Sequence, residues 1–209
     1  MTRDQFVELI RRNLQGSDAP AAIRGKYSER EIQLYAQMAY DDMVGIIGNE
    51  ANKTKDYSLL DNFGKSYKRI IATDTEREEK YIDLDIQVVP LGDNMGIRQV
   101  SPYKGQQNAF QYRDNNAQAV FSKLLVDVVC STPTYYVELP RIYFDDKIDK
   151  DLTTVMVKLI PPFSQLKGDD DVFVPGGQNG RVFQTVLELI QNKERHPQMY
   201  NNSGSSKQI

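Results

Sequence analysis

The sequence predicts an α+β fold. Helices come first, a central and mostly antiparallel β domain of sandwich or barrel-like form follows, and one helix lies near the C-terminus. Two patterns carry this prediction. Apolar residues recur every three or four positions in 3–14, 29–47 and 180–191, as on one face of a helix. In 153–160 they alternate with polar residues, as in a half-buried strand.

Both N-terminal helices carry a start signal. Thr2 with Gln5, and Ser28 with Glu31, have the spacing of a capping box, in which each side chain bonds the backbone amide of the other residue. The first helix is therefore expected over 3–14 and the second to begin at residue 29. Their apolar faces need a partner, because two helices alone bury little surface.

Breaks in the pattern divide the chain into three predicted parts. Gly48 is expected to stop the second helix, and the polar residues 49–56 to form a linker. The predicted parts are an N-terminal helical region over 1–56, a β-rich domain with the last helix over 57–192, and a mobile tail over 193–209.

The β-rich region is organised around residues 80–100. Two strands, 80–89 and 96–100, are expected there, joined by the turn-forming sequence PLGDN. Gly96 is expected where a side chain would crowd the backbone. Strands on either side of Pro140 form either a hairpin or one interrupted edge strand. Further strands are expected at 67–73, 110–113, 135–139, 141–144 and 153–160, and residues 57–67 form a short helical turn or irregular structure.

The sequence of residues 117–130 is ambiguous between helix and strand. Their first half is read as helix and their second as strand, because β-branched residues gather at Val126, Val128 and Val129. Cys130 follows this apolar run and is expected to be a buried small hydrophobe. As the only cysteine, it excludes an internal disulfide and a site built from several cysteines.

Composition narrows the classes of partner. The net charge is −3, so broad, sequence-independent wrapping by DNA is not expected. The twelve tyrosines are typical either of half-buried β faces or of a protein interface, and the sequence does not decide between these two interpretations. The N-terminal stretch is amphipathic and contains acids, unlike a signal peptide, and no apolar run reaches 18 residues. We therefore expect a soluble protein without a membrane partner.

The sequence contains no convincing catalytic set. His196, the only histidine, stands beside Pro197 in the predicted tail, and a dyad with Cys130 has no supporting motif. Residues 176–180, GGQNG, precede a helix and could hold an anion, although simple helix capping is favoured.

Acidic residues provide the one enzymatic alternative. A metal-dependent hydrolase would use Asp145, Asp149 and the triplet Asp169, Asp170 and Asp171. The triplet is better explained as a solvated loop that protects a sheet edge from pairing. We therefore predict no enzymatic activity, no catalytic residue, no cofactor and no metal.

One segment resembles a known group of proteins. Residues 91–102, LGDNMGIRQVSP, are similar to a recurring motif in virion proteins of tailed phages of Bacteroidetes, including crAss-like phages. Further motifs follow in the same order as in those proteins: Phe110, RIYF at 141–144, VMVKLI at 155–160 and DVFVP at 171–175 before the last helix. The resemblance covers roughly residues 57–192. It departs at 197–202, where the sequence PQMYNN stands in place of an acidic C-terminal end. Which ring component of the virion the chain would correspond to is therefore left open.

The resemblance implies a structural role in the virion. Such proteins form oligomeric rings in the head-to-tail connector or neck, which joins portal to tail and lets DNA pass during genome ejection. The implied partners are copies of the chain, about twelve by analogy with the portal, together with the portal and other neck or tail proteins. An alternative is another virion component, a capsid auxiliary or a tail subunit. In either case the N-terminal helices and the strand edges at 135–144 are expected to meet neighbours.

Overall fold

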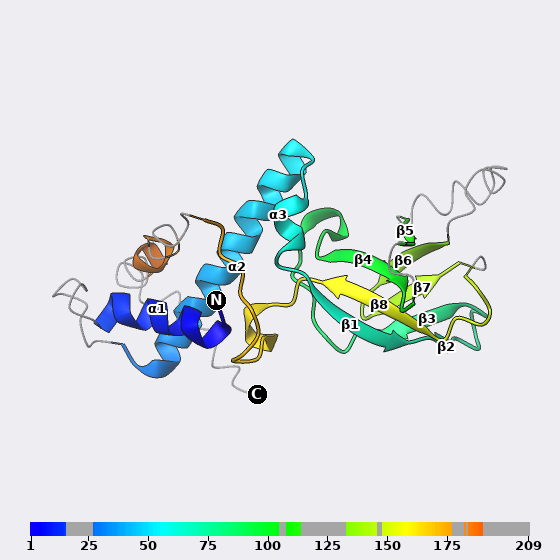
Figure 1. Ribbon diagram of the computed structural model, residues 1–209, viewed down its shortest axis with the longest axis horizontal. Coiled ribbons are helices and arrows are strands. Elements are labelled where there is room, and N and C mark those ends of the chain that lie inside the picture. The colour runs from blue at the N-terminus through cyan, green and yellow to red at the C-terminus, as the bar shows by residue number, and fades with distance from the viewer. Residues whose placement is uncertain are drawn as a thin grey trace, which may run out of the picture. The chain divides into compact units, whose positions relative to one another are not determined.

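The computed structural model describes residues 1–15, 27–104, 108–113, 133–145, 148–176, 182 and 184–189. The chain divides into two compact units (Figure 1). The helical unit comprises Met1–Glu50 and Leu166–Ile209, and the β unit comprises Ala51–Gln165. Helices near both ends of the chain and largely antiparallel sheets between them confirm the predicted α+β fold.

Both predicted capping boxes are present. Helix α1 spans Arg3–Gln15 and helix α2 spans Glu29–Thr54. The amide of Thr2 donates to Gln5 Oε1 at 2.9 Å, and the amide of Gln5 donates to Thr2 Oγ1 at 3.2 Å. Ser28 and Glu31 exchange the same two bonds, at 3.0 and 3.4 Å. The predicted helix starts are therefore confirmed.

The predicted end of α2 is wrong. The helix passes through Gly48 and continues to Thr54, so most of the expected linker over 49–56 is helical. A glycine inside a helix costs only about 1 kcal/mol relative to alanine, and the buried side chain of Ala51 in the next turn favours continuation. The helix ends where Lys55 adopts a left-handed conformation, with φ 59°.

The start of the chain is paired with a later segment of the helical unit. Met1 and Val172 exchange two backbone hydrogen bonds, and Thr2 forms an isolated β-bridge with Asp171. The amide of Asp4 donates to the carbonyl of Gly168 at 3.1 Å. The compact units therefore group the segment after residue 165 with the N-terminal helices, whereas the predicted β-rich domain extended to residue 192. The chain is helical at Val182 and 184–189, inside the predicted last helix, and the predicted tail 193–209 lies outside the described residues.

The strands described in the β unit form two sheets (Figure 1). All neighbouring strands are antiparallel except the β5–β6 pair, which is parallel. The three-stranded sheet has the order β1 (Lys65–Ile70), β8 (Thr154–Leu159), β4 (Ile97–Pro102). The five-stranded sheet has the order β2 (Ala72–Thr73), β3 (Lys80–Asp83), β7 (Arg141–Phe144), β6 (Thr134–Glu138), β5 (Gln111–Tyr112). The described part of the unit also contains the short helices α3 (Ser58–Asp61), η1 (Gly92–Asn94) and η3 (Phe163–Gln165).

An apolar core joins the two sheets. The alternation predicted for the last strand is confirmed, since Val155, Val157 and Leu159 of β8 are fully buried. They share one cluster with Ile82, Ile142 and Phe144 of the five-stranded sheet. Further members lie on strands (Ile97, Val100 and Tyr135) or in the segments beside them (Leu84, Phe110 and Ile148). The inward faces of two sheets thus pack on each other, as in a sandwich.

The strand expected over 80–89 is shorter than predicted. Strands β6 and β7 form a hairpin that turns at Leu139 and Pro140, which decides between the two alternatives considered for this region. Because β7 begins only at Arg141, its pairing with β3 stops at Asp83. The chain beyond Asp83 loses its sheet partner at that point and runs irregularly to Leu91. Residues 117–130, including Cys130, lie outside the described residues.

Candidate interaction surface

The acidic residues considered for metal binding serve local backbone structure. Asp145 Oδ2 accepts hydrogen bonds from Thr134, from its amide at 3.1 Å and its Oγ1 at 2.6 Å. Asp149 Oδ1 accepts from the amide of Asp151, and Asp170 Oδ2 from the amide of Lys167. In the part of the chain that the structure describes, no group of three or more His, Cys, Asp or Glu could hold a metal ion. His196 and residues 177–180 lie outside that part.

Residues 91–102 form a structural junction of the β unit. Asn94, at φ 53°, donates a side-chain hydrogen bond to the hydroxyl of Tyr112 in the five-stranded sheet. Arg98 on β4 forms an ion pair with Asp61, with Nε and Oδ1 2.8 Å apart. The carbonyl of Val100, also on β4, accepts from the amide of Phe110 at 2.8 Å. These residues tie the three-stranded sheet to its surroundings.

Gly96 occupies the tightest point of this junction. A Cβ atom there would lie 2.4 Å from the carbonyl oxygen of Val89 and 2.5 Å from Cγ1 of Val88. Backbone bonds hold both sides together: Val89 and Ile160 are joined at 3.0 Å, and Ile160 and Gly96 at 2.8 Å. The crowding expected at Gly96 from the sequence is confirmed.

An apolar groove lies where β3 loses its partner. Segment 84–90 lines it together with the turn between β6 and β7, and we call it the hairpin groove; its volume is about 300 Å³. Leu139 is 66% exposed beside it. Six of its eight residues are apolar: the lining comprises Leu84, Asp85, Ile86, Gln87, Val88, Pro90, Leu139 and Pro140. An exposed apolar hollow of this kind is typical of an interaction site.

The backbone along the groove is only partly paired. Leu84 donates to the carbonyl of Pro140 at 2.8 Å, Gln87 to Gln165 Oε1 at 3.0 Å, and Val89 to the carbonyl of Ile160 at 3.0 Å. Within the described ranges, the amides of Ile86 and Val88 have no hydrogen-bond partner. The groove therefore combines apolar side chains with backbone groups that a further strand can pair with.

The face of the five-stranded sheet opposite the apolar core carries a row of tyrosines, of which Tyr136 and Tyr143 are buried. Tyr81, Tyr143 and Tyr136 stand opposite one another on β3, β7 and β6. The rings of Tyr136 and Tyr143 stack with their centroids 5.2 Å apart. The guanidinium of Arg141 lies 4.3 Å from the ring of Tyr81, and that of Arg77 lies 4.9 Å from the ring of Tyr143. Each contact has the geometry of a cation–π interaction.

The two arginines that lie over these rings each form an ion pair with a carboxylate of the same chain. Arg77 pairs with Glu138 at 2.7 Å and Arg141 with Asp83 at 3.0 Å. Burial, and then the hydrogen bond to Glu79, raise the pKa of Tyr136, so its hydroxyl remains a neutral donor. The tyrosines are thus covered by paired charges, and this face is a weaker candidate for binding than the hairpin groove.

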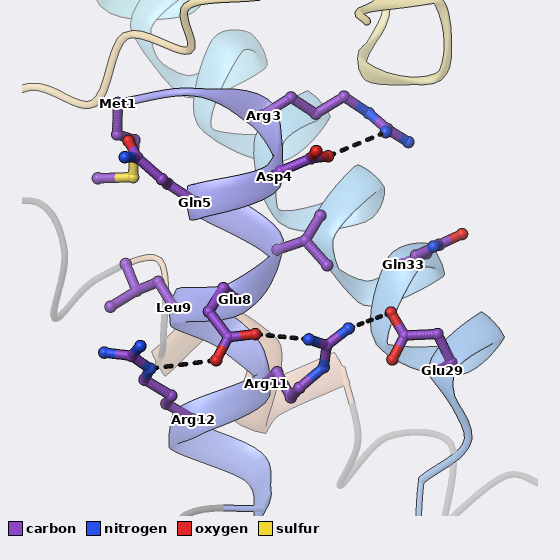
Figure 2. Close-up of a pocket in the computed structure, with 11 residues that line it drawn as sticks. Met1, Arg3, Asp4, Gln5, Glu8, Leu9, Arg11, Arg12, Glu29 and Gln33 are labelled. Carbon is purple, nitrogen blue, oxygen red and sulfur yellow. Dashed lines mark hydrogen bonds and ion pairs between the residues drawn. The ribbon is translucent and has the colours of Figure 1, made fainter. Parts of the chain in front are cut away.

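The helical unit has a charged hollow of about 830 Å³ between α1 and α2, shown in Figure 2. Glu8 contacts Arg11 at 2.5 Å and Arg12 at 3.1 Å, and Arg11 also reaches Glu29 at the start of α2. The hydrogen bond from Arg12 is the main cause that lowers the pKa of Glu8. Since these charges compensate one another across two helices, the cluster fastens α1 to α2.

Comparison with known proteins gives no assignment: a scan of protein-family models, a search of curated proteins and a search of solved structures each found no match. Among the described residues, no helix has both the length and the apolar character needed to cross a membrane.

Proposed function

We propose that this chain is a non-enzymatic structural subunit of a tailed-phage virion, part of an oligomeric ring in the head-to-tail connector. The observation that carries the proposal is the hairpin groove, which exposes apolar side chains and unpaired amides on a well-packed β unit. Exposed apolar surface and an open strand edge both favour association with another protein. The order of sequence motifs over residues 57–192 supports a virion protein as the class.

The chemistry of the chain is compatible with a ring around DNA. A closed ring requires heterologous contacts, in which one surface of a subunit meets a different surface of the next. The net charge of −3 disfavours tight binding to phosphate, so DNA can pass without being retained. By analogy with the portal, about twelve copies are expected.

Purified particles of a phage that encodes this chain provide the test. Mass spectrometry is expected to detect the chain in particles freed of host protein, and cryo-electron microscopy to locate it as a ring between portal and tail. Location on the capsid surface or along the tail would favour the alternative virion roles. A chain that is a stable monomer in solution and absent from the particles would contradict the proposal.

A further inference from the structure

We propose that the hairpin groove receives an extended apolar segment from a second copy of this chain, which adds to the β unit as a strand. The inference deepens the proposed function, since it names the contact that would link neighbouring subunits. Three properties of the groove lead to it: the absence of a strand where β7 would continue, the unpaired amides, and the lack of net charge.

The missing strand follows from the register. Strand β7 pairs with β3 from Phe144 opposite Lys80 to Arg141 opposite Asp83, and the last bond joins Leu84 to Pro140. The hairpin turn removes β7 from the segment that follows. That segment, 84–90, contains seven residues and can span at most about 25 Å, enough to pair with a short strand.

The unpaired amides select an extended backbone as the occupant. Ile86 and Val88 are half-buried against the core, and within the described ranges their N–H groups donate to nothing. A peptide lying alongside as a strand supplies carbonyl oxygens at the two-residue spacing of these amides. This is recognition by β-strand addition, with main-chain hydrogen bonds for affinity and alternate side chains for specificity.

The charge of the groove selects an apolar occupant. Among the described residues that line it, Asp85 is the only charged one, and the carboxylate of Asp85 is already paired with the guanidinium of Arg69. The occupant of the groove therefore does not need to supply a positive charge for Asp85. The occupant is expected to present apolar side chains at alternate positions toward Ile86, Val88 and Leu139, with any charge on its opposite face.

The chain's own sequence contains a segment of this composition. Residues 124–129, LLVDVV, place Leu124, Val126 and Val128 at alternate positions, while Asp127 falls on the other face of a strand. Six extended residues span about 20 Å, which matches the groove segment. Only the sequence of this segment is used, because it lies outside the described residues. Since donor segment and groove are different parts of one chain, repeated insertion gives head-to-tail contacts.

The test measures binding of a fluorescent peptide of residues 122–131, carrying Cys130→Ser, to the full-length chain at a concentration where the chain is monomeric. The peptide is expected to bind and, in excess, to lower the mass of any oligomer formed at higher concentration. Leu139→Asp in the chain should weaken peptide binding by about tenfold or more. The matched control is Ile70→Asp, which changes another exposed aliphatic residue of the β unit and should leave binding unchanged.

A second peptide keeps the test decisive if Leu139→Asp does not fold. Val126→Pro in the peptide removes a backbone donor and disturbs strand pairing, so this peptide should bind at least about tenfold more weakly. The inference is overturned if neither peptide binds at about 1 mM, if both bind equally, or if Leu139→Asp and Ile70→Asp have equal effects. A virion ring that forms while these tests fail would contradict the strand contact and leave the proposed function in place.

Discussion

Single residues of the β unit are held in place by backbone contacts, and Gly96 is the clearest case. The carbonyl oxygen of Val89 leaves no room for a Cβ atom, and the backbones of Val89 and Gly96 are both fixed by hydrogen bonds with Ile160. Asn94, two residues earlier, takes a positive φ and contacts Tyr112. Residues 91–102 thus include side chains and a glycine that hold the β unit together.

Gly96→Ala should lower the free energy of unfolding by about 2–3 kcal/mol, because relief of the clash requires movement of backbone. The measurement is chemical denaturation followed by circular dichroism. Gly45→Ala in α2 is the matched control: nothing lies within 4 Å of a Cβ there, so alanine should add about 0.5–1 kcal/mol. Equal effects of the two substitutions would argue against a special role for Gly96.

The sequence was informative about Gly96 and about the buried face of β8, because glycine in a turn and strict alternation are local signals. It could not reveal the hairpin groove. That surface depends on where β7 begins relative to β3, a long-range register that no local pattern records. The importance of Leu139 likewise follows only from its exposure beside the groove.

At the scale of the helices, local sequence predicted the starts better than the ends. Both capping boxes formed as expected, since each needs only residues three positions apart. The end of α2 was misplaced because glycine is a weak stop signal when burial beyond it favours helix, as it does at Ala51.

Ser28→Ala should lower the free energy of unfolding by about 1 kcal/mol, because the amide of Glu31 loses its side-chain acceptor at the start of α2. Thermal unfolding monitored by circular dichroism measures the change. Ser28→Asp retains an acceptor and should recover most of the loss. If the aspartate variant is no better than the alanine variant, capping is not the reason for the effect.

The ion pairs between α1 and α2 should make stability depend on pH. The pKa of Glu8 is lowered in the folded state, first by the hydrogen bond from Arg12. Stability from Glu8 is therefore complete above its usual pKa of about 4.5 and is lost as the pH falls through the lower, folded-state value.

Glu8→Gln should thus destabilise the chain at pH 7, and the difference from wild type should disappear on acidification below about pH 4.5. Urea unfolding at several pH values measures it. An Arg12→Gln background should reduce the effect, because the main cause of the shift is gone. A difference that stays constant down to pH 3 would contradict this explanation.

At the scale of the whole molecule, the predicted fold class was confirmed, while the grouping of segments needed the structure. Residues after 165 belong with the N-terminal helices because Met1, Thr2 and Asp4 pair with the segment around 168–172. Sequence periodicity reports only on local structure, so it could not predict a pairing between the first residues and a segment so distant in the chain.

We propose that this chain works by assembly with copies of itself in a virion. The decisive measurement is a cryo-electron microscopy reconstruction of the intact particle. We expect a closed ring of the chain around the DNA passage, between portal and tail, in which the hairpin groove of each subunit is covered by its neighbour. A reconstruction that accounts for every connector component without this chain would contradict it.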